Sequence, residues 1–509
     1  MFTVRDVNSD GGSGRAKPVA IVIGSGFGGL AAAVRLGARG YAVKILERLD
    51  APGGRAYVHR MGGFTFDAGP TIVTAPFLFE ELWSLCGRRL ADDVELVPMK
   101  PFYKIRFPDG ATFTYSSDRA AMRAEVERFS PGEADHLDAF LKMSEAIYRI
   151  GFEKLGDEPF NSILDMAKIA PELIRLQGYR SVYSVVSSFF KDERLRTVFS
   201  FHPLLIGGDP FRASSIYCLI AFLETTFGVH SAIGGTGALT RGLVGLIESQ
   251  GGEIRYRADV SQILVEGGKA VGVELSDGER LRADIVVSNA DSAWTYRHLV
   301  PASARRRWTD AKLNRAKYSM GLFLWYFGTD RRYDEVGHHT ILMGPRYREL
   351  LKDIFRRKKL SDDFSLYLHR PTATDPSVAP PGCDAFYVLS PVPNLQGGQD
   401  WSVEAETYRQ RIESWLEANL LPDLGRHIVV SKVTTPIDFR DRLNATHGEG
   451  FGLEPLLTQS AWFRPHNRSE DVKNLFLVGA GVHPGAGLPG VLSSARVLDK
   501  VAPHASAFV

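Results

Sequence analysis

Hydrophobic residues near the start of the chain fall into runs of different length. Residues 20–23 and 42–46 are short apolar runs, and the stretch between them, residues 30–39, is long enough for a helix. Short apolar runs next to a glycine turn are typical of buried strands. The pattern predicts a strand, a helix and a second strand, the unit from which doubly wound α/β domains are built.

The middle of the chain carries a different pattern. Residues 118–230 are mostly helical by pattern, with long apolar and aromatic faces. Further strands are expected over residues 102–107, 112–115, 253–256, 260–265, 270–275 and 285–288. The turn Pro108-Asp109-Gly110 joins the first two into a hairpin. Residues 474–503 predict a strand, a glycine loop and a helix, so both ends of the chain resemble parts of one nucleotide-binding unit.

Composition and charge exclude several classes of protein. The 509 residues include 61 Lys or Arg and 59 Asp or Glu, so the net charge is +2 and we expect no nucleic-acid partner. Cys86, Cys218 and Cys383 have no disulfide or zinc spacing, which favours a reducing compartment. Residues 18–34 are uncharged but broken by glycines, and residues 213–223 are too short to cross a bilayer. We expect neither a signal peptide nor a transmembrane helix.

A glycine fingerprint stands between the first predicted strand and helix. Residues 24–29 read Gly-Ser-Gly-Phe-Gly-Gly, and Glu47 follows the second predicted strand. Gly24 allows a tight turn, Gly26 lets the backbone approach a pyrophosphate, and Gly29 lets the helix pack closely on the strand. The helix start offers free N–H groups to phosphate, and a carboxylate at position 47 accepts hydrogen bonds from ribose hydroxyls. The sequence therefore predicts a dinucleotide site.

The residues that follow Glu47 resemble a known family. Pro52-Gly53-Gly54-Arg55 and the run Gly-Phe-Thr-Phe-Asp-Ala-Gly-Pro-Thr over residues 63–71 are similar to the flavin amine oxidase and phytoene desaturase superfamily. The resemblance implies that Glu47 holds the adenine ribose of FAD and that Gly54 and Arg55 line the cofactor. Paired glycines expose N–H groups, and an arginine offers a forked donor. A surface arginine after a turn is the alternative interpretation of Arg55.

A second glycine junction lies near the end of the sequence. Residues 474–491 contain Gly-Ala-Gly-Val-His-Pro-Gly-Ala-Gly and resemble the signature of bacterial-type phytoene desaturases. Because FAD spans a longer distance than NAD, a second set of helix N–H groups favours FAD, and an NAD-dependent dehydrogenase would leave it without a ligand. By resemblance, the backbone of Val260 meets the adenine. His483 is given no proton-transfer role, since a loop histidine bonded to the backbone explains it equally well.

The residues assigned to FAD binding lie at strand ends, in glycine loops or at helix starts. They are Gly24, Ser25, Gly26, Gly29, Glu47, Arg48, Gly54, Arg55, Pro70, Thr71, Val260, Gly479, Gly490 and Val491. We assign no catalytic residue and no metal ligand from the sequence. Asp67, for example, reads equally well as a proton acceptor and as a structural loop cap.

The resemblance implies an oxidoreductase that acts on CH–CH groups. It would desaturate 15-cis-phytoene through phytofluene and zeta-carotene to neurosporene or lycopene, with quinone or oxygen as the electron acceptor. A hydrocarbon has no polar group to grip, so we expect a long apolar tunnel, while FAD carries the oxidation. Three alternatives stay open: a sister desaturase acting on hydroxy- or methoxyneurosporene or a thirty-carbon analogue, an amine oxidase of the same fold, and a non-catalytic carotenoid-binding flavoprotein.

The expected organisation follows from these assignments. We expect an α/β fold with a discontinuous, Rossmann-like FAD-binding domain over residues 18–85, 230–300 and 470–503, preceded by a flexible lead over residues 1–17. Residues 86–229 and 301–469 would form an inserted, partly helical region for substrate and membrane. A peripheral position on the cytoplasmic side of a membrane is expected because phytoene lives in bilayers. The candidate contacts are the basic runs at residues 305–308 and 356–359, for which a solvated helix face is the alternative, and the apolar residues 216–222, which could instead line the substrate tunnel.

Overall fold

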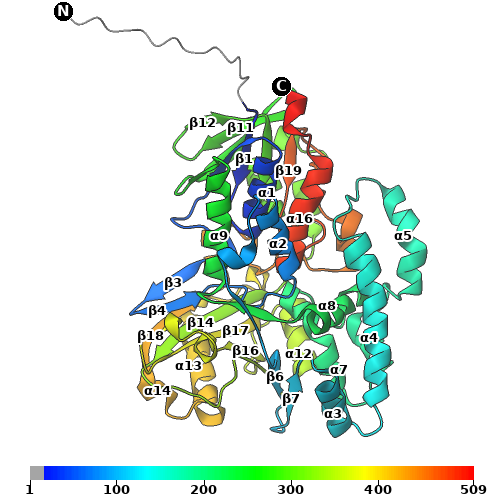
Figure 1. Ribbon diagram of the computed structural model, residues 1–509, viewed down its shortest axis with the longest axis vertical. Coiled ribbons are helices and arrows are strands. Elements are labelled where there is room, and N and C mark those ends of the chain that lie inside the picture. Colours follow the sequence, from blue (N-terminus) through cyan, green and yellow to red (C-terminus); the bar gives the residue numbers. More distant parts are fainter. Residues whose placement is uncertain (1–16, 509) are drawn as a thin grey trace, which may run out of the picture.

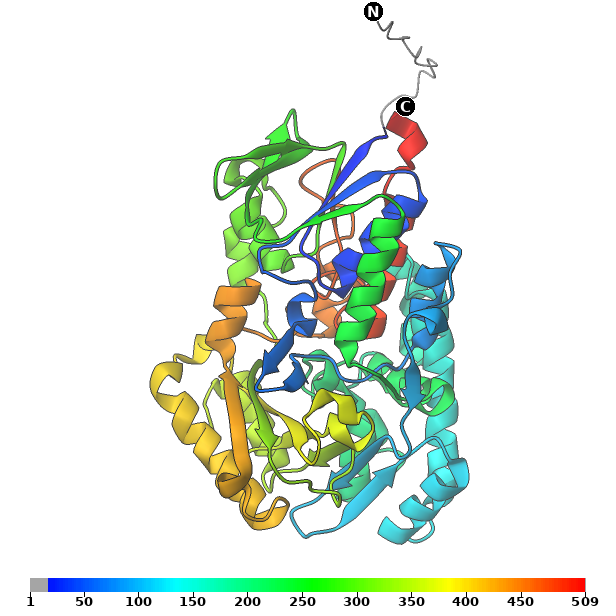
Figure 2. The ribbon, with the colours of Figure 1, turned by 60° about the vertical axis from the view of Figure 1, so that its left-hand side comes forward.

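The computed structural model describes residues 17–508. The predicted flexible lead over residues 1–17 lies, apart from Lys17, outside the described residues. Two large sheets lie at opposite ends of the molecule, and helices pack along one side of both (Figures 1 and 2). The predicted α/β class is therefore confirmed.

A five-stranded parallel sheet forms one end of the molecule. Its strand order is β19-β13-β1-β2-β9, and its strands are β1 (Val19–Ile23), β2 (Ala42–Leu46), β9 (Glu253–Arg255), β13 (Ile285–Ser288) and β19 (Leu475–Leu477). The central strand β1 is apolar on both faces, as a parallel sheet covered on both sides requires. Three stretches far apart in the sequence thus build one sheet.

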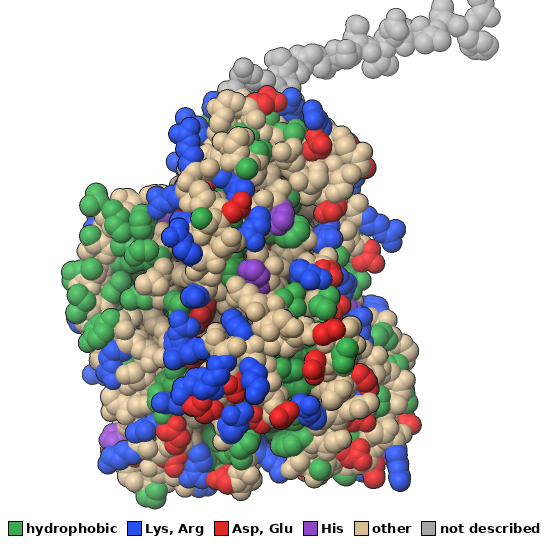
Figure 3. All heavy atoms as spheres, turned by 180° about the vertical axis from the view of Figure 1, so that it is seen from behind, with side chains coloured by type: hydrophobic (Ala, Val, Ile, Leu, Met, Phe, Trp, Pro, Cys, Tyr) green, Lys and Arg blue, Asp and Glu red, His purple; other side chains and the backbone are tan. Residues whose placement is uncertain are grey.

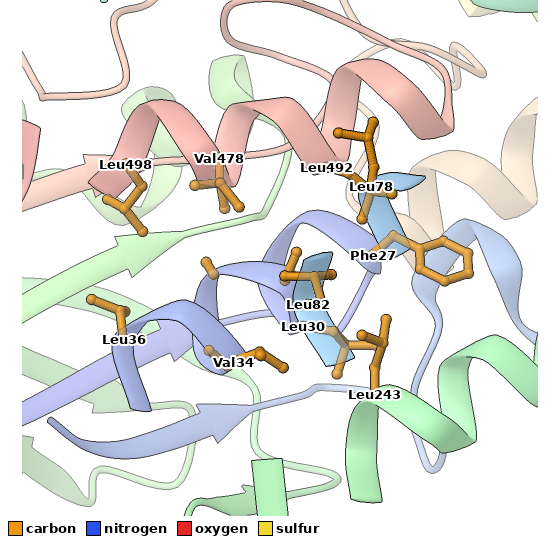
Figure 4. Close-up of a cluster of buried hydrophobic side chains, with 14 of the residues drawn as sticks. Phe27, Leu30, Val34, Leu36, Leu78, Leu82, Leu243, Val478, Leu492 and Leu498 are labelled. Atoms are coloured by element: carbon orange, nitrogen blue, oxygen red, sulfur yellow. The ribbon is translucent and has the colours of Figure 1, made fainter. Parts of the chain in front are cut away.

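Helices cover one face of this sheet and form a core with it. They are α1 (Phe27–Ala38), α2 (Pro76–Ser84), α9 (Thr236–Ser249) and α16 (Leu488–Val501). Leu30 and Val34 of α1 meet Leu243 of α9 and Leu492 of α16 (Figure 4). The opposite face packs against an antiparallel sheet of β10 (Val260–Glu266), β11 (Lys269–Leu275) and β12 (Arg280–Arg282).

A seven-stranded mixed sheet forms the other end of the molecule. Its order is β18-β14-β17-β16-β15-β6-β7, and its strands are β6 (Tyr103–Arg106), β7 (Thr112–Tyr115), β14 (Gly321–Thr329), β15 (His339–Leu342), β16 (Leu366–His369), β17 (Asp384–Val392) and β18 (Ile428–Thr434). Every residue of β14 is buried. One face packs against α13 (Trp401–Asn419), and the other faces the centre of the molecule.

The helical stretch predicted over residues 118–230 is confirmed. It contains α3 (Arg119–Phe129), α4 (Ala134–Tyr148), α5 (Ile163–Arg175), α6 (Val182–Val186), α7 (Glu193–Ser200) and α8 (Leu219–Phe227). The remaining strands and helices are β3 (Val58–Met61), β4 (Phe64–Asp67), β5 (Leu96–Pro98), β8 (His230–Ala232), α10 (Ser292–Trp294), α11 (Asp310–Arg315), α12 (Tyr347–Lys352), α14 (Leu424–His427) and α15 (Pro436–Leu443). The predicted hairpin is formed by β6 and β7.

The structure corrects one predicted boundary. The first helix was expected to begin at Leu30, but α1 begins at Phe27, so that Gly28 and Gly29 belong to its first turn. The N–H of Leu30 donates to the carbonyl of Gly26 at 2.9 Å, which closes that turn immediately after β1. Among residues 17–508, no helix combines the length and apolar character needed to cross a membrane.

Candidate active site

A cavity of about 540 Å³ lies between the two large sheets. We call its two parts the glycine half and the apolar half. The glycine half is walled by Gly24, Gly26, Gly28, Gly53, Gly54, Gly479 and Gly490. The apolar half is walled by Met166, Ile169, Leu173, Leu205, Ile220, Leu223, Leu322, Leu324 and Leu389. One continuous space therefore connects backbone-rich walls at the parallel sheet with hydrocarbon walls at the mixed sheet.

The first glycine turn brings bare backbone to the cavity. Gly24 has φ +88°, a conformation that favours glycine, and its N–H donates to the carbonyl of Leu46 at 2.8 Å. A Cβ atom on Gly29 would lie 2.1 Å from the carbonyl oxygen of Gly24. The helix start therefore sits directly against the strand end, and its first N–H groups carry the partial positive charge of α1.

Glu47 is fixed at the end of β2. Its Oε2 accepts hydrogen bonds from the N–H of Ser25 at 2.8 Å and from its Oγ at 2.7 Å, and its Oε1 accepts from the N–H of Leu49 at 2.8 Å. The side chain lines the cavity although only 4% of its surface is exposed. Each carboxylate oxygen has more than one lone pair, so Glu47 keeps acceptor capacity for a hydroxyl-bearing ligand.

Arg48 also lines the cavity, but its guanidinium is held by a neighbouring loop. Its Nη1 donates to the carbonyl of Asp441 at 2.9 Å and to Oδ1 of Asn444. Its Nε lies 3.7 Å from Oδ1 of Asp259. Arg48 therefore closes the rim of the cavity and joins β2 to the loop after α15.

Arg55 has the donors expected of a ligand-binding arginine. It follows Gly53 and Gly54, both with positive φ, and it lines the cavity. Its Nε and Nη2 are shielded from solvent and have no hydrogen-bond partner among the described residues. Leaving buried donors unsatisfied costs about 1–3 kcal/mol each, so the pair indicates a missing acceptor. The alternative interpretation, a surface arginine, does not fit this shielding.

Two buried carboxyl groups lie near Arg55. Asp291 lines the cavity and accepts a hydrogen bond from Oγ1 of Thr446 at 3.3 Å, while Oε2 of Glu449 accepts from the N–H of His447 at 2.7 Å. Burial, and after it the charge of Asp291, raises the pKa of Glu449 to about 8. Burial also raises the pKa of Asp291. Glu449 therefore holds a proton at neutral pH.

The second glycine junction packs directly against the first, since a Cβ atom on Gly28 would lie 2.8 Å from the Cα atom of Gly479. Gly479 has φ +92°, and its N–H donates to Oγ of Ser494 at 2.8 Å. The helix α16 then begins at Leu488, and Gly490 and Val491 in its first turn line the cavity. A second helix N-terminus is thus directed at the same space as α1.

The structure places nearly all of the sequence-predicted residues together. Apart from Ser25 and Gly29, every residue predicted to bind the cofactor lines the cavity. Ser25 acts behind the wall by holding Glu47, and Gly29 does so by packing on Gly24. Pro70, Thr71 and Val260 belong to the wall itself. Their contacts with a cofactor stay a prediction.

Asp67 and His483 have structural contacts. Asp67 accepts hydrogen bonds from the N–H groups of Thr236 at 2.9 Å and Gly237 at 3.4 Å, so it caps the start of α9. Nε2 of His483 lies 3.0 Å from the carbonyl of Leu155, and burial lowers the pKa of His483 to about 4. The loop-cap interpretation of Asp67 and the backbone-bonded interpretation of His483 both agree with these contacts.

Sequence reasoning missed Asn289 and the walls of the apolar half. A Cβ atom on Gly28 or Gly479 would lie 2.6 Å from Oδ1 of Asn289, so this side chain fills the space between the two glycine junctions. No spacing rule in the sequence predicts that contact. The apolar half is lined from helices and strands that are far apart in the chain, and its leucines and isoleucines look like any other core residues.

Comparison with known proteins decides the family. A family profile described as "Flavin containing amine oxidoreductase" matches residues 27–497. The chain belongs to the flavin-containing amine oxidoreductase family. It is 52% identical over 491 residues to the phytoene desaturase (neurosporene-forming) of Cereibacter sphaeroides, which covers 96% of this chain and 95% of that one. It is 49% identical over 479 residues to the phytoene desaturase (lycopene-forming) of Pantoea ananas, with 93% and 97% covered.

Solved structures show the same fold at low sequence identity. A putrescine oxidase variant aligns over 97% of this chain and 99% of its own, with a TM-score of 0.65 and 15% identity. An oxidoreductase from Methanosarcina mazei aligns over 95% and 100%, with a TM-score of 0.61 and 18% identity. The predicted fold, an FAD-binding Rossmann-like part with an inserted region, is therefore confirmed.

The cofactor of this oxidoreductase is FAD. The glycine half has the groups that such a molecule requires. Two helix N-termini suit its phosphates, Glu47 suits a ribose, and the unpartnered Nε and Nη2 of Arg55 provide a forked donor. Gly28 and Gly29 let the start of α1 pack against Gly24 and Gly479, because a Cβ atom on either would collide with neighbouring atoms. The residues present therefore fit the cofactor.

Proposed function

We propose that this protein is a phytoene desaturase, which converts 15-cis-phytoene to neurosporene or lycopene in carotenoid biosynthesis. Relatives about half identical over almost their whole length carry that name and form one product or the other. The observation that carries the proposal is the single cavity in which a glycine-lined cofactor half opens into an apolar half. The walls of the apolar half named above are apolar side chains, which suits a hydrocarbon. Glu224, next to Leu223 on α8, also lines the cavity, and its carboxylate accepts a hydrogen bond from the hydroxyl of Tyr103 at 2.8 Å.

The chain's own residues position the substrate and exclude water. Bound FAD supplies the acceptor for a hydride removed from an allylic carbon. Ile220, Leu324 and the other apolar walls hold the hydrocarbon by dispersion and burial. A dry wall also keeps water away from the positive charge that develops on the substrate. Glu449, protonated at neutral pH, leaves at most one negative charge beside Arg55 in the carboxyl pair that it forms with Asp291.

We also propose the predicted division of the chain and the predicted cofactor contacts. Residues 18–85, 230–300 and 470–503 would form the FAD-binding domain, and residues 86–229 and 301–469 the substrate-binding and membrane-associating regions. The five parallel strands all fall in the first set of ranges. Quinone or oxygen would reoxidise the flavin.

We propose that the protein docks on the cytoplasmic face of a membrane through α5. This helix has no buried residue, and hydrophobic side chains gather on the molecular surface that it forms (Figure 3, left). Ile163 is 50% exposed, and Leu164 and Ile174 are each 66% exposed. Met166, Ile169 and Leu173 of the same helix line the apolar half. A lipid-soluble substrate would thus pass from the bilayer to the cavity beside one helix.

The docking segments suggested by sequence have other contacts. Arg305 is paired with Asp310 at 2.7 Å, and Arg307 with Glu470 at 2.5 Å. Arg357 is paired with Asp353 at 2.6 Å. Residues 216–222 include Ile216, Leu219 and Ile220, which line the cavity. The second interpretation of that segment, a tunnel wall, therefore agrees with the structure.

The function is tested by giving the purified protein phytoene in liposomes without oxygen. We expect the flavin to bleach as phytofluene forms, because one bound FAD accepts the electrons of one desaturation, and chromatography to show neurosporene or lycopene once quinone or oxygen is added to reoxidise the flavin. A flavin that stays oxidised would contradict the proposal and favour a carotenoid-binding flavoprotein. Bleaching by hydroxyneurosporene or by a thirty-carbon analogue, but not by phytoene, would favour a sister desaturase. Relatives of that last type are more distant, as shown by the 34% identical 4,4'-diapophytoene desaturase of Methylomonas.

Docking is tested by vesicle flotation of Ile163→Asp combined with Leu164→Asp. Two apolar side chains buried in the lipid contribute several kcal/mol to the free energy of vesicle binding. Binding of the double variant should therefore fall at least about tenfold. Val403→Asp is the matched control, because Val403 on α13 is 66% exposed but lies outside α5. Equal losses in both proteins would contradict docking through α5.

A further inference from the structure

Three histidines form a cluster in the mixed sheet, outside the cavity walls described above. His339 begins β15 and is paired in register with His369 at the end of β16, and His338 directly precedes β15. Their ring centroids lie 4.4, 4.8 and 5.2 Å apart, and one nitrogen of each lies within 4.8 Å of the other two. We propose that these imidazoles bind a divalent transition metal ion of the zinc class.

An unsatisfied nitrogen is the first argument for a ligand. His339 is 2% exposed, and its Nε2 is buried without a hydrogen-bond partner among the described residues. The Nε2 atoms of His338 and His369 lie 3.0 Å apart. A bare buried nitrogen costs free energy, and a cation bound to it removes that cost. Imidazole suits zinc, iron, nickel and copper.

The outer hydrogen bonds of two rings are those of metal-binding histidines. Nδ1 of His338 lies 2.6 Å from Oγ1 of Thr374, and Nδ1 of His339 lies 2.7 Å from the hydroxyl of Tyr367. Such bonds fix the ring orientation and leave the other nitrogen for the ion. Both outer bonds use Nδ1. Nε2 of His339 therefore has no partner, and Nε2 of His338 shares with Nε2 of His369 a hydrogen bond that a bound ion would replace.

Protonation and charge also suit a cation. Burial lowers the pKa of His338 to about 4 and those of His339 and His369 well below their usual range, so all three rings are neutral at pH 7. The nearby guanidinium of Arg370 is neutralised by Asp384 at 2.9 Å and by Asp334 at 2.8 Å.

The spacing and access of the cluster are compatible with an ion. Zinc–nitrogen bonds of about 2 Å place tetrahedral ligand atoms about 3.3 Å apart, close to the separation of His338 and His369. The third ring, that of His339, has to move inward to complete three ligands, because the ligand atoms of the cluster lie up to 4.8 Å apart. His338 is half-buried and gives the ion a route from solvent.

The site is linked to the cofactor wall. The hydroxyl of Tyr367 bonds His339 and also lies 2.6 Å from Oγ1 of Thr71. Thr71 lines the cavity. An ion that fixes His339 therefore also fixes Tyr367 and the loop that carries Thr71, so removing the ion should weaken FAD retention severalfold.

The test uses the FAD-loaded protein, purified without a polyhistidine tag. The protein is dialysed against Zn²⁺, freed of excess metal, and analysed for zinc and flavin in the same sample. We expect about one zinc ion per chain, and at least about tenfold less zinc in His339→Gln and in His338→Gln. The control His504→Gln removes an exposed histidine outside the cluster and should keep the zinc of the unmutated protein.

Three results would overturn the proposal. One is FAD-loaded, unmutated protein with less than about a tenth of an ion per chain. Another is unchanged zinc in the folded histidine variants. Should both variants fail to fold, X-ray absorption of the unmutated protein decides, because the site requires three imidazole nitrogens at about 2 Å. A thiolate or all-oxygen shell would be the third contrary result. None of these measurements depends on desaturase activity.

Discussion

The glycine half and the apolar half of the cavity are built by opposite means. The glycine half consists of backbone at the ends of β1 and β19 and at the starts of α1 and α16, with Asn289 between them. The apolar half consists of side chains from α5, α8, β14 and β17 and of Leu205. Backbone sites demand one residue type at each position, whereas a hydrocarbon wall demands volume and shape.

This difference separates two kinds of constraint on the enzyme. In the proposed assignment, fixed N–H groups and a few charged atoms bind FAD, so a single added methyl group should disrupt its half. The outline of the other half would select the hydrocarbon, so exchanges of similar volume should be tolerated and changed volumes should alter which substrate fits. Substitutions in the two halves should therefore impair different properties of the enzyme: flavin binding in the glycine half and substrate turnover in the apolar half.

The largest effect is expected from Gly29→Ala. The added Cβ would lie 2.1 Å from the carbonyl oxygen of Gly24, so α1 must move away from β1. Purified protein should lose nearly all of its flavin, at least about tenfold by absorbance. Gly245→Ala on α9 is the matched control, because nothing lies within 4 Å of its added Cβ. A fully yellow Gly29→Ala protein would refute the backbone account of this half.

Arg55→Met should weaken FAD binding while leaving the fold intact. The change removes two shielded donors that have no partner in the described protein, and charge-assisted bonds contribute about 1.5–3 kcal/mol. Fluorescence titration of deflavinated protein should give a Kd roughly 10–100-fold higher. Arg60→Met, an exposed change nearby, should leave Kd unchanged. Equal affinities in all three proteins would show that Arg55 does not contact the cofactor.

Ile220→Trp should block the apolar half and spare the glycine half. Ile220 lines the cavity from α8, and the larger ring occupies space that the substrate needs. Turnover of phytoene should fall about tenfold at unchanged flavin content. Val429→Trp on β18 is the control, since Val429 is 51% exposed. Loss of flavin in the Ile220→Trp protein would show that the two halves are not independent.

Glu449→Gln should produce the smallest change, visible as a changed pH dependence of stability. The pKa of Glu449 is about 8 in the folded protein against 4.5 for an ordinary glutamate. Between these values the folded state binds more protons, so the free energy of unfolding falls as pH rises from 4.5 to 8. The free energy of unfolding of the variant does not decline in this way. Relative to that of the unmutated protein, it should rise by about 1–3 kcal/mol between pH 5 and pH 8.

Urea unfolding curves of the variant and of the unmutated protein are measured at pH 5 and at pH 8. The difference between their free energies of unfolding is then compared at the two pH values. Burial also raises the pKa of Glu454, to about 7, but this residue is present in both proteins and cancels in the difference. Glu253→Gln, at an exposed position of β9, is the control and should show no gain. A difference that does not vary with pH would mean that Glu449 is ionised in the fold.

The glycine half could be predicted from sequence because its chemistry is local. Gly24, Gly26 and Glu47 follow strands at fixed spacings, and those spacings alone bring them to one strand edge. Asn289 could not be assigned a role, since its contacts with Gly28 and Gly479 depend on how three distant segments pack.

The apolar half and the histidine cluster could not be predicted for the same reason. Ile220 and Leu324 meet across the cavity only after α8 is placed against the mixed sheet. His339 and His369 become neighbours through the pairing of β15 with β16, whose register no residue type in the sequence fixes. The exposed face of α5 was also missed, although its apolar residues recur at helical spacing.

The assembly of the parallel sheet from distant segments has a consequence for how the enzyme is made. The ribosome releases β1, α1 and β2 first, while β19 and α16, which complete the sheet and cover α1, emerge last. A nascent chain therefore carries an unpaired edge at β13 and an uncovered apolar helix until translation is almost finished. Flavin capture must follow synthesis, and chaperones that shield such surfaces should set the yield of active enzyme in a cell.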